Sequence, residues 1–299
     1  MLLVWNFDIM IIVMTDIKKV SVVVPNYNYA KYISKRIDSI LRQTYPIYEL
    51  IILDDYSTDN SVEVIERKIE DIKVKYPELK VRFVKNEKNS GKAMRQWRKG
   101  FELAEGDYVW IAEVDDLASR NFLAEAMKRF DDPKVVISYA ESAIINSFGL
   151  MVIPNFRWSR DKEKTGHYKR SYVNDGNKEI EEIMAIRCTI PNVSGAVFKN
   201  DKKFLKYFDK ATEFSQAGDW YFYAKVLENG KIAYNRKSLN KFRVHSSSKT
   251  SRSKKDRTHF DEVVLMHEYF NKNYDLKSSV RRAIEVEESR IKEKHGIIE

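Results

Sequence analysis

The stretch VSVVVPNYNYAKYISKRIDSILRQTYPIYELIILDDYSTDNS, residues 20–61, decides the fold of this chain. It begins with a run of valines over 20–24, interrupted only by Ser21, that Pro25 ends. A run of this kind without polar alternation is typical of a strand buried on both faces of a parallel sheet. Apolar residues then recur at helical spacing through 33–41, and a second apolar run at 49–53 predicts the next strand. The stretch therefore predicts a strand–helix–strand unit.

The same alternation continues beyond this unit. We expect helices over 61–76 and 93–106 and strands beginning at 80 and over 108–112. This order predicts an α/β fold with a doubly wound, mostly parallel sheet, in which ligands bind beyond the carboxyl ends of the strands. The loops expected at that edge are those at Asn26, 54–59, 89–92 and 113–116.

The second half of the chain has weaker periodicity, and its elements are predicted from composition and turn residues. We expect helices over 121–130, 177–188, 216–230, 259–274 and 279–296, strands over 134–146 and 192–200, two edge strands over 231–245, and polar loops over 156–176 and 246–258.

Composition describes a globular chain, with 43% hydrophobic and 32% charged residues. The single cysteine, Cys188, excludes an internal disulfide framework and fits a reducing compartment. The apolar segment 1–14 is too short for a membrane-spanning helix and lacks the basic leader of a signal peptide. It is either an extra strand or interfacial segment, or an artefact of an incorrect start site, with Met14 as the true start. We expect a cytoplasmic protein.

The net charge of +9 requires anionic partners. Nucleic acid, an anionic membrane surface and a phosphorylated substrate all fit this charge. A nucleic-acid partner does not explain acids gathered at strand ends, so we expect none.

Three acids, Glu113, Asp115 and Asp116, follow the strand predicted at 108–112. Mg²⁺ and Mn²⁺ take such oxygen ligands, commonly one or two carboxylates completed by phosphates and water. The alternative is an N-cap for the helix that follows, which accounts for one acid but not for three.

Two further loops carry groups that a nucleotide could use. Asp55 could accept hydrogen bonds from a base or ribose, although an ordinary turn and cap explains 54–59 equally well. Gly91 opens a helix whose N-terminus suits a phosphate, and Lys92 and Arg95 could add charged contacts. This loop matches neither the P-loop nor the dinucleotide-binding glycine pattern.

Asp219 opens the helix predicted at 216–230 and is either its cap or a general base. His245 precedes the basic loop, Lys249–Arg257, and a lone histidine is more often structural than a ligand. Cys188 has no evident nucleophilic partner and is interpreted as structural.

The order of these segments resembles the family 2 glycosyltransferases, which are inverting enzymes of the GT-A fold. The resemblance rests on residues 20–61, on NSGKAMRQWRKGFELAEGDYVWIAEVDD (89–116), on GDW (218–220) and on RVHSSS (243–248). It covers about 18–250 and implies a GT-A domain there, followed by a basic loop and C-terminal helical extension at 251–299 and preceded by the apolar segment 1–17. Within the domain we expect a nucleotide-binding half, 18–117, and an acceptor half, 118–250.

The resemblance also implies roles for individual residues. Asp219 would be the catalytic base, and Asp115 and Asp116 would hold Mn²⁺ or Mg²⁺. The implied nucleotide-sugar contacts are Pro25, Tyr27, Asp54, Asp55, Gly91, Lys92, Arg95, Glu113, Asp115 and His245. Two positions depart from the family pattern: Glu113 replaces the first acid of the D-x-D metal motif, and Gly218 replaces the acid that precedes the base.

The implied function is transfer of a sugar from a nucleotide diphosphate sugar to a hydroxyl of a glycan, lipid-linked or protein-linked acceptor, in cell-surface polysaccharide or glycoconjugate synthesis. The basic loop would close over the diphosphate or hold the enzyme at the inner face of the plasma membrane, or it is simply solvated. The alternatives are a non-catalytic nucleotide-sugar-binding protein, given Gly218, and a sugar nucleotidyltransferase. The latter would need a Gly-rich loop where this chain has PNYNYAKY, residues 25–32.

Overall fold

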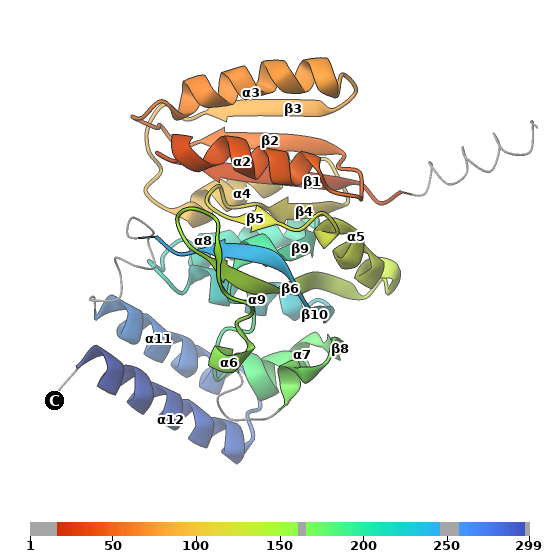
Figure 1. Cartoon of the computed structure of the whole chain (residues 1–299). Helices are drawn as coiled ribbons and strands as arrows, with labels where there is room; N and C mark the ends of the chain where they lie inside the picture. Colours follow the sequence, from red (N-terminus) through yellow and green to blue (C-terminus); the bar gives the residue numbers. More distant parts are fainter. Residues whose placement is uncertain (1–16, 161–165, 246–256, 297–299) are drawn as a thin grey trace, which may run out of the picture.

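The computed structural model describes residues 17–160, 166–245 and 257–296 (Figure 1). Its first half has the predicted order of alternating strands and helices. The elements are β1 (Val20–Asn26), α2 (Ala30–Leu41), β2 (Glu49–Asp54), α3 (Ser61–Lys75), β3 (Lys80–Lys85), α4 (Ala93–Leu103) and β4 (Tyr108–Ile111).

Both faces of these strands are covered, which explains the unbroken apolar runs. Val22 and Val24 of β1 belong to one core, with α2, α3 and α5 (Phe122–Met127) above them. Val23, which points the other way, belongs to a second core with α4 and α9 (Gly218–Leu227). Successive side chains of a strand alternate between faces, so a strand between two helical layers must be apolar at every position.

The carboxyl ends of the parallel strands meet at one edge, as predicted. The sheet order begins β3-β2-β1-β4, and all three of these pairs are parallel. Asn26 at the end of β1 pairs with Asp54 at the end of β2. The loops that follow these strands therefore start side by side.

The second half continues the same sheet in a mixed arrangement, with the order β4-β9-β6-β10-β5. Its further elements are β5 (Leu117–Ala118), β6 (Val135–Ile145), β7 (Met151–Ile153), α6 (Arg157–Arg160), β8 (Tyr172–Asp175), α7 (Gly176–Glu179), β9 (Ala196–Lys199), α8 (Tyr207–Ala211) and β10 (Lys231–Arg243), together with short 3₁₀ and π segments. Two of these, α6 and β8, lie where a loop was predicted.

The prediction of two edge strands over 231–245 is wrong. The segment forms one long strand, β10, which lies inside the sheet between β6 and β5. Its pairing with β6 shifts register between Asn235 and Ser238 and again before Asn240. This irregularity and the polar residues around it resemble a turn in the sequence, although the strand continues through it.

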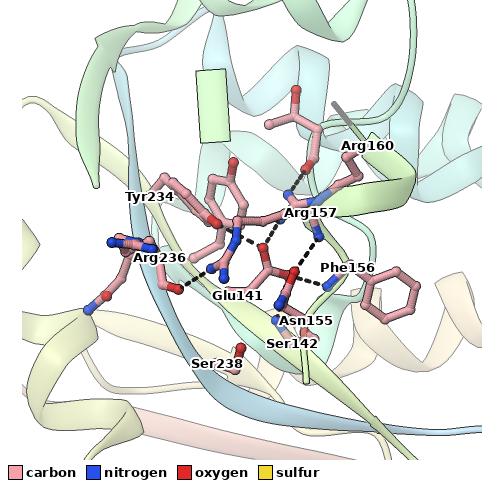
Figure 2. Close-up of polar contacts among 12 residues, drawn as sticks. Glu141, Ser142, Asn155, Phe156, Arg157, Arg160, Tyr234, Arg236 and Ser238 are labelled. Atoms are coloured by element: carbon pink, nitrogen blue, oxygen red, sulfur yellow. Dashed lines mark hydrogen bonds and ion pairs between the residues drawn. The ribbon is translucent and has the colours of Figure 1, made fainter. Parts of the chain in front are cut away.

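A buried ion pair ties the segment after β7 to the sheet (Figure 2). Glu141 of β6 is fully buried and accepts from Arg160 Nη2 at 2.5 Å and from the Tyr234 hydroxyl at 2.8 Å. The same guanidinium donates to the Thr189 carbonyl at 3.0 Å. A buried charge with this many partners fixes its surroundings in one arrangement.

Two helices, α11 (Thr258–Asn273) and α12 (Ser278–His295), complete the chain as predicted. Met266 and Ile284 on them belong to the same core as α4 and α9, so the helical extension packs against the sheet domain. No helix in the described part is long and apolar enough to cross a membrane. The apolar segment 1–16 and nearly all of the basic loop lie outside the described residues, and the division at 117 stays a prediction.

Candidate active site

At the first acidic corner, which lies at the end of β2, the carboxylates accept hydrogen bonds from uncharged donors. Asp54 is 1% exposed and accepts from Asn26 Nδ2 at 2.8 Å, from Ser57 Oγ at 2.6 Å and from the Ser57 backbone N at 2.9 Å. These bonds hold the loop after β1 against the loop after β2. The main role of Asp54 in this structure is therefore to hold these two loops in place.

Asp55 joins the third loop to this corner. Its Oδ1 accepts from Asn86 Nδ2 at 2.6 Å, from the Ser90 backbone N at 2.8 Å and from Gln96 Nε2 at 2.9 Å. Its Oδ2 accepts from Ser90 Oγ at 2.7 Å. Since a carboxylate oxygen has about two lone-pair directions, Oδ2 is the atom with capacity left for a ligand.

Aromatic side chains lie beside this corner. Pro25 is buried within β1, whereas Tyr27 is 44% exposed and Tyr56 is 53% exposed. Tyr56 and Asn28 both have left-handed backbones, with φ of 66° and 59°. Non-glycine residues adopt this conformation rarely, mostly where surrounding bonds impose it. Asn28 is held in this way, because its Oδ1 accepts from the Thr58 N at 2.7 Å.

In the segment 89–95, the three residues predicted to contact the nucleotide sugar already form hydrogen bonds within the protein. Gly91 is left-handed, with φ 77°, and its N donates to Asn89 Oδ1 at 2.6 Å. Lys92 donates to carbonyls at the end of α8, including that of Thr212 at 2.6 Å, so its ammonium group holds α8 to α4. Arg95 is exposed and uses Nη1 to bond the Ser90 carbonyl at 2.6 Å. Arg95 is thus the better placed cation for a ligand.

The second acidic corner, at the end of β4, lies against Arg243 and His245. Asp115 Oδ2 lies 3.0 Å from His245 Nε2, and the Asp115 carbonyl accepts from Arg243 Nε at 2.6 Å. His245 is held between Tyr29 and Tyr32, with ring centroids at 5.6 and 5.4 Å. The end of β10 therefore meets the end of β4, which brings two predicted site residues from opposite halves of the sequence together.

Asp116 points into the protein. It is 1% exposed, Oδ1 accepts from the Arg243 backbone N at 2.9 Å, and Oδ2 accepts from Asn192 Nδ2 at 2.9 Å. Burial and the neighbouring Asp115 raise the pKa of Asp116 to about 6. Both oxygens are occupied, which favours Asp115 over Asp116 as a metal ligand.

Glu113 lies against α4 and the loop before β9. Its Oε1 accepts from Trp97 Nε1 at 2.6 Å, and its backbone N donates to Ser194 Oγ at 3.0 Å. Burial, together with the charge on Asp115, raises the pKa of Glu113 to about 8. At neutral pH this side chain is therefore largely protonated and can donate a hydrogen bond, which an aspartate of ordinary pKa cannot do.

A buried cation lies behind these acids. Arg36 of α2 is fully buried, stacks over the Trp110 ring at 5.0 Å and has no hydrogen-bond partner among the described residues. Burial lowers its pKa to about 10, and Asp116, Asp115 and Glu113 oppose that shift. The guanidinium remains charged at neutral pH and offsets part of the repulsion within the acidic corner.

Asp219 lies in the first turn of α9, where its Oδ1 accepts from the Trp220 N at 2.7 Å. The neighbouring Tyr223 is fully buried, and its hydroxyl has no hydrogen-bond partner within the described ranges. Burial raises the pKa of Tyr223 well above its usual value, and Asp219 and Glu113 both add to the rise. The predicted base and the acidic corner therefore lie within electrostatic reach of one side chain.

Close packing explains why position 218 is glycine rather than an acid. A Cβ at this position would lie 2.4 Å from the Ala211 carbonyl oxygen and 3.2 Å from Met94 Cγ. A Cβ does not come within 3.0 Å of a backbone oxygen in folded proteins, so no acid fits before Asp219 unless the backbone moves. Cys188 lies nearby, and burial raises the pKa of its thiol well above the usual value, which keeps it unreactive.

The oxygen atoms at the end of β4 can hold a divalent cation only if the substrate supplies further ligands. Mg²⁺ and Mn²⁺ need only one or two carboxylates when phosphates and water complete the shell. No donor among the described residues reaches Asp115 Oδ1, and the His245 imidazole lies beside Oδ2. The described part of the chain holds no group of three or more metal-binding side chains. A cation here would therefore depend on the substrate for most of its ligands.

The family model for glycosyl transferase family 2 matches residues 21–179, which is more than half of the chain. The chain belongs to glycosyltransferase family 2. The matched segment contains both acidic corners and all four loops of the predicted ligand edge, and it ends before Asp219 and His245.

Curated family 2 relatives match over shorter stretches. Glycosyltransferase GlyG of Streptococcus pneumoniae is 36% identical over 105 residues, 35% of this chain and 32% of GlyG. The poly(ribitol-phosphate) beta-N-acetylglucosaminyltransferase TarP of Staphylococcus aureus is 38% identical over 112 residues, 36% of this chain and 32% of TarP. The chain thus matches about a third of the length of these relatives.

Solved structures extend the likeness of fold to nearly the whole chain. S. aureus TarS 1–349 in complex with UDP-GlcNAc has a TM-score of 0.64 and 21% identity, covering 92% of this chain and 72% of TarS 1–349. A mannosyltransferase from Pyrobaculum calidifontis, in complex with GDP-Man and Mn²⁺, has a TM-score of 0.62 and 18% identity, covering 93% of this chain and 73% of that enzyme. The predicted GT-A fold is confirmed.

Sequence reasoning missed several residues that shape this site. They are Arg36, Tyr56, Asn86, Ser90, Gln96, Trp97, Asn192, Ser194 and Tyr223. Four of them carried a local signal, because Tyr56 and Ser90 lie in loops predicted at the ligand edge and Gln96 and Trp97 lie on the helix that follows one of these loops. The others act through contacts between distant segments, which spacing along the sequence does not show.

Proposed function

We propose that this protein transfers a sugar from a nucleotide diphosphate sugar to a hydroxyl of a glycan acceptor, with inversion at the anomeric carbon. The observation that carries the proposal is the meeting of Asp115, which follows β4, with His245 from the end of β10 at the ligand edge of the sheet. Asp219 on α9 and Glu113 after β4 both act on the pKa of the buried Tyr223, which supports a place for Asp219 beside this edge. Membership of family 2 supports this chemistry, and the names of TarS and TarP point to a polymeric acceptor.

The donor would lie across the loops that follow β1, β2 and β3. Asp55 would accept from the base or ribose through Oδ2, and the exposed rings of Tyr27 and Tyr56 offer faces on which a base can stack. Arg95 would approach the diphosphate from the start of α4. Asp54, Gly91 and Lys92 would act on the donor indirectly by holding these loops in place.

In the reaction, the acceptor oxygen would attack the anomeric carbon while the bond from that carbon to the phosphate oxygen breaks. Asp219 would take the proton of the attacking hydroxyl. Asp115, with His245 beside it, would hold Mn²⁺ or Mg²⁺, which supplies positive charge to the leaving diphosphate. Glu113, protonated at neutral pH, would donate a hydrogen bond to the ribose or to a phosphate oxygen.

A panel of UDP-, GDP- and dTDP-sugars, scored by release of the nucleoside diphosphate with and without a glycan acceptor, tests the proposal. We expect acceptor-dependent release from one donor class, with stimulation by Mn²⁺ and loss in EDTA. Donor binding without turnover for any acceptor would instead favour the non-catalytic binding protein, which is the alternative raised by Gly218. Release of pyrophosphate from a nucleoside triphosphate and a sugar phosphate would identify a nucleotidyltransferase.

A further inference from the structure

We propose that the hollow beside β8 binds a phosphate-bearing unit of an extended glycan or polyol chain, away from the corner where Asp115 meets His245. The inference rests on the proposed function for its biological meaning, but the binding itself can be tested alone. The hollow has a volume of about 610 Å³. Its lining residues are Gly166, His167, Lys169, Arg170, Tyr172, Val173, Asn174, Lys178 and Glu182.

The rim of this hollow carries three cationic side chains. Lys169, Arg170 and Lys178 are exposed, and none of them forms an ion pair with a carboxylate in the described residues. The one acid of the lining, Glu182, lies 3.2 Å from Lys277, outside the hollow, so its charge is already offset. The three cations are therefore available to an anion that enters.

The floor is polar and held in place. Glu179 is fully buried, and its Oε1 lies 3.2 Å from both His167 Nε2 and the Tyr172 hydroxyl, while its Oε2 accepts from Asn174 Nδ2 at 2.9 Å. The neighbouring Tyr168 stacks under Arg160 at 4.2 Å. A floor fixed by buried hydrogen bonds offers groups that can bind hydroxyls without reordering.

The hollow is separate from the corner where Asp115 meets His245. Tyr172, Val173 and Asn174 pair with the first residues of β10, whereas His245 follows its last. The 13 residues of β10 place the two ends about 40 Å apart. Figure 1 shows β8 and α7 at the end of β10 opposite to the one that approaches β4.

Size and shape select the class of ligand. A hollow of this volume takes a sugar- or polyol-sized unit rather than a single small ion. A flat bilayer surface and a DNA duplex would contact the exposed cations without entering it. A flexible chain of hydroxylated units joined by phosphates would fill both the basic rim and the polar floor. A contact this far from the Asp115–His245 corner would favour long acceptors over short ones.

Binding of a glycerol phosphate oligomer to the full chain, measured by calorimetry, tests this assignment. The variant Lys169→Ala/Arg170→Ala/Lys178→Ala should bind the oligomer at least about tenfold more weakly. The control Lys35→Ala/Lys75→Ala/Arg120→Ala removes the same charge from exposed sites elsewhere and should stay within about twofold of wild type. Equal melting temperatures would show that both variants fold, and a neutral gluco-oligosaccharide should bind weakly to all three proteins.

Equal weakening in both variants, or none in the first, would overturn the proposal. So would a case in which the hollow variant loses only binding to phosphatidylglycerol vesicles and keeps oligomer binding, since the surface would then be a membrane contact. Asp219→Asn should retain oligomer binding in full. Failure of the transferase function and failure of this site therefore give different results.

Discussion

The two acidic corners of this molecule look alike in sequence and differ in structure. After β2, the carboxylates of Asp54 and Asp55 accept from amides, hydroxyls and backbone N–H groups. After β4, Asp115 lies against His245, and Asp116 lies near the buried cation Arg36. At the first corner, neutral donors fix the loops. At the second corner, Asp115 Oδ1 has no donor among the described residues and Arg36 lies buried behind the acids, so this corner can accept a cation or a substrate.

This difference separates structural from chemical roles. Substitutions at the first corner should change stability and donor affinity together, because the loops lose their shape. Substitutions at the second corner should change the rate and the binding of metal with little effect on unfolding. The predictions below test whether the two corners can be separated in this way.

The largest of these effects is expected for Asp115→Asn. The transfer rate should fall by about 100-fold or more, because the single carboxylate that can hold the cation is lost. Binding of Mn²⁺ in the presence of UDP, followed by electron paramagnetic resonance, should weaken in parallel, while the melting temperature changes by less than about 2 °C. The control is Asp131→Asn, an exposed carboxylate that pairs with Lys18. Unchanged Mn²⁺ binding would remove Asp115 as the ligand.

A smaller effect, on stability, is expected for Asp55→Asn. The amide nitrogen that replaces one oxygen would face a donor, so at least one buried hydrogen bond is lost at a cost of about 1–3 kcal/mol. Thermal unfolding should show a drop of several degrees, and donor affinity should fall with it. A variant with wild-type stability and weak donor binding would mean that Asp55 contacts the nucleotide without organising the loops.

The sequence predicted the parallel half of the fold well, because strands such as β1 and β2 are apolar at every position and turn residues separate them from the helices. It also predicted which loops meet at the ligand edge, which follows from the parallel arrangement alone. The interior position of β10 could not be predicted, since the polar, irregular segment near Ser238 resembles a turn.

Within the site, the sequence predicted which residues lie at the ligand edge, but not which of their side chains are open to a ligand. It predicted that Asp115, Asp116 and Lys92 all contact a ligand or metal. In the structure, Asp116 points inward and Lys92 is hydrogen-bonded to the end of α8. The partners responsible, Asn192 and Thr212, are distant in the sequence. Local spacing therefore carries no information on which of the marked side chains is open to a ligand.

The third effect, which is confined to the pH dependence of stability, is expected for Glu113→Gln. The folded state raises the pKa of Glu113 to about 8, above its usual 4.5, so the folded protein binds more protons than the unfolded chain between these values. Stability conferred by this group is therefore lost as pH rises from about 4.5 to 8. Glutamine stays neutral at every pH. The free energy of unfolding of the variant, relative to that of wild type, should therefore be higher at pH 8.5 than at pH 5.5. Urea unfolding without metal or donor measures this difference. Parallel pH profiles would contradict the raised pKa.

The most direct test of the central claim is the rate of Asp219→Asn at saturating donor and acceptor, with the affinity for the nucleoside diphosphate measured in the same preparation. Loss of the general base should lower transfer by about 10²–10⁴-fold and leave nucleotide affinity within about twofold, because Asp219 lies on α9, outside the donor loops. A variant that transfers sugar near the wild-type rate would contradict the account.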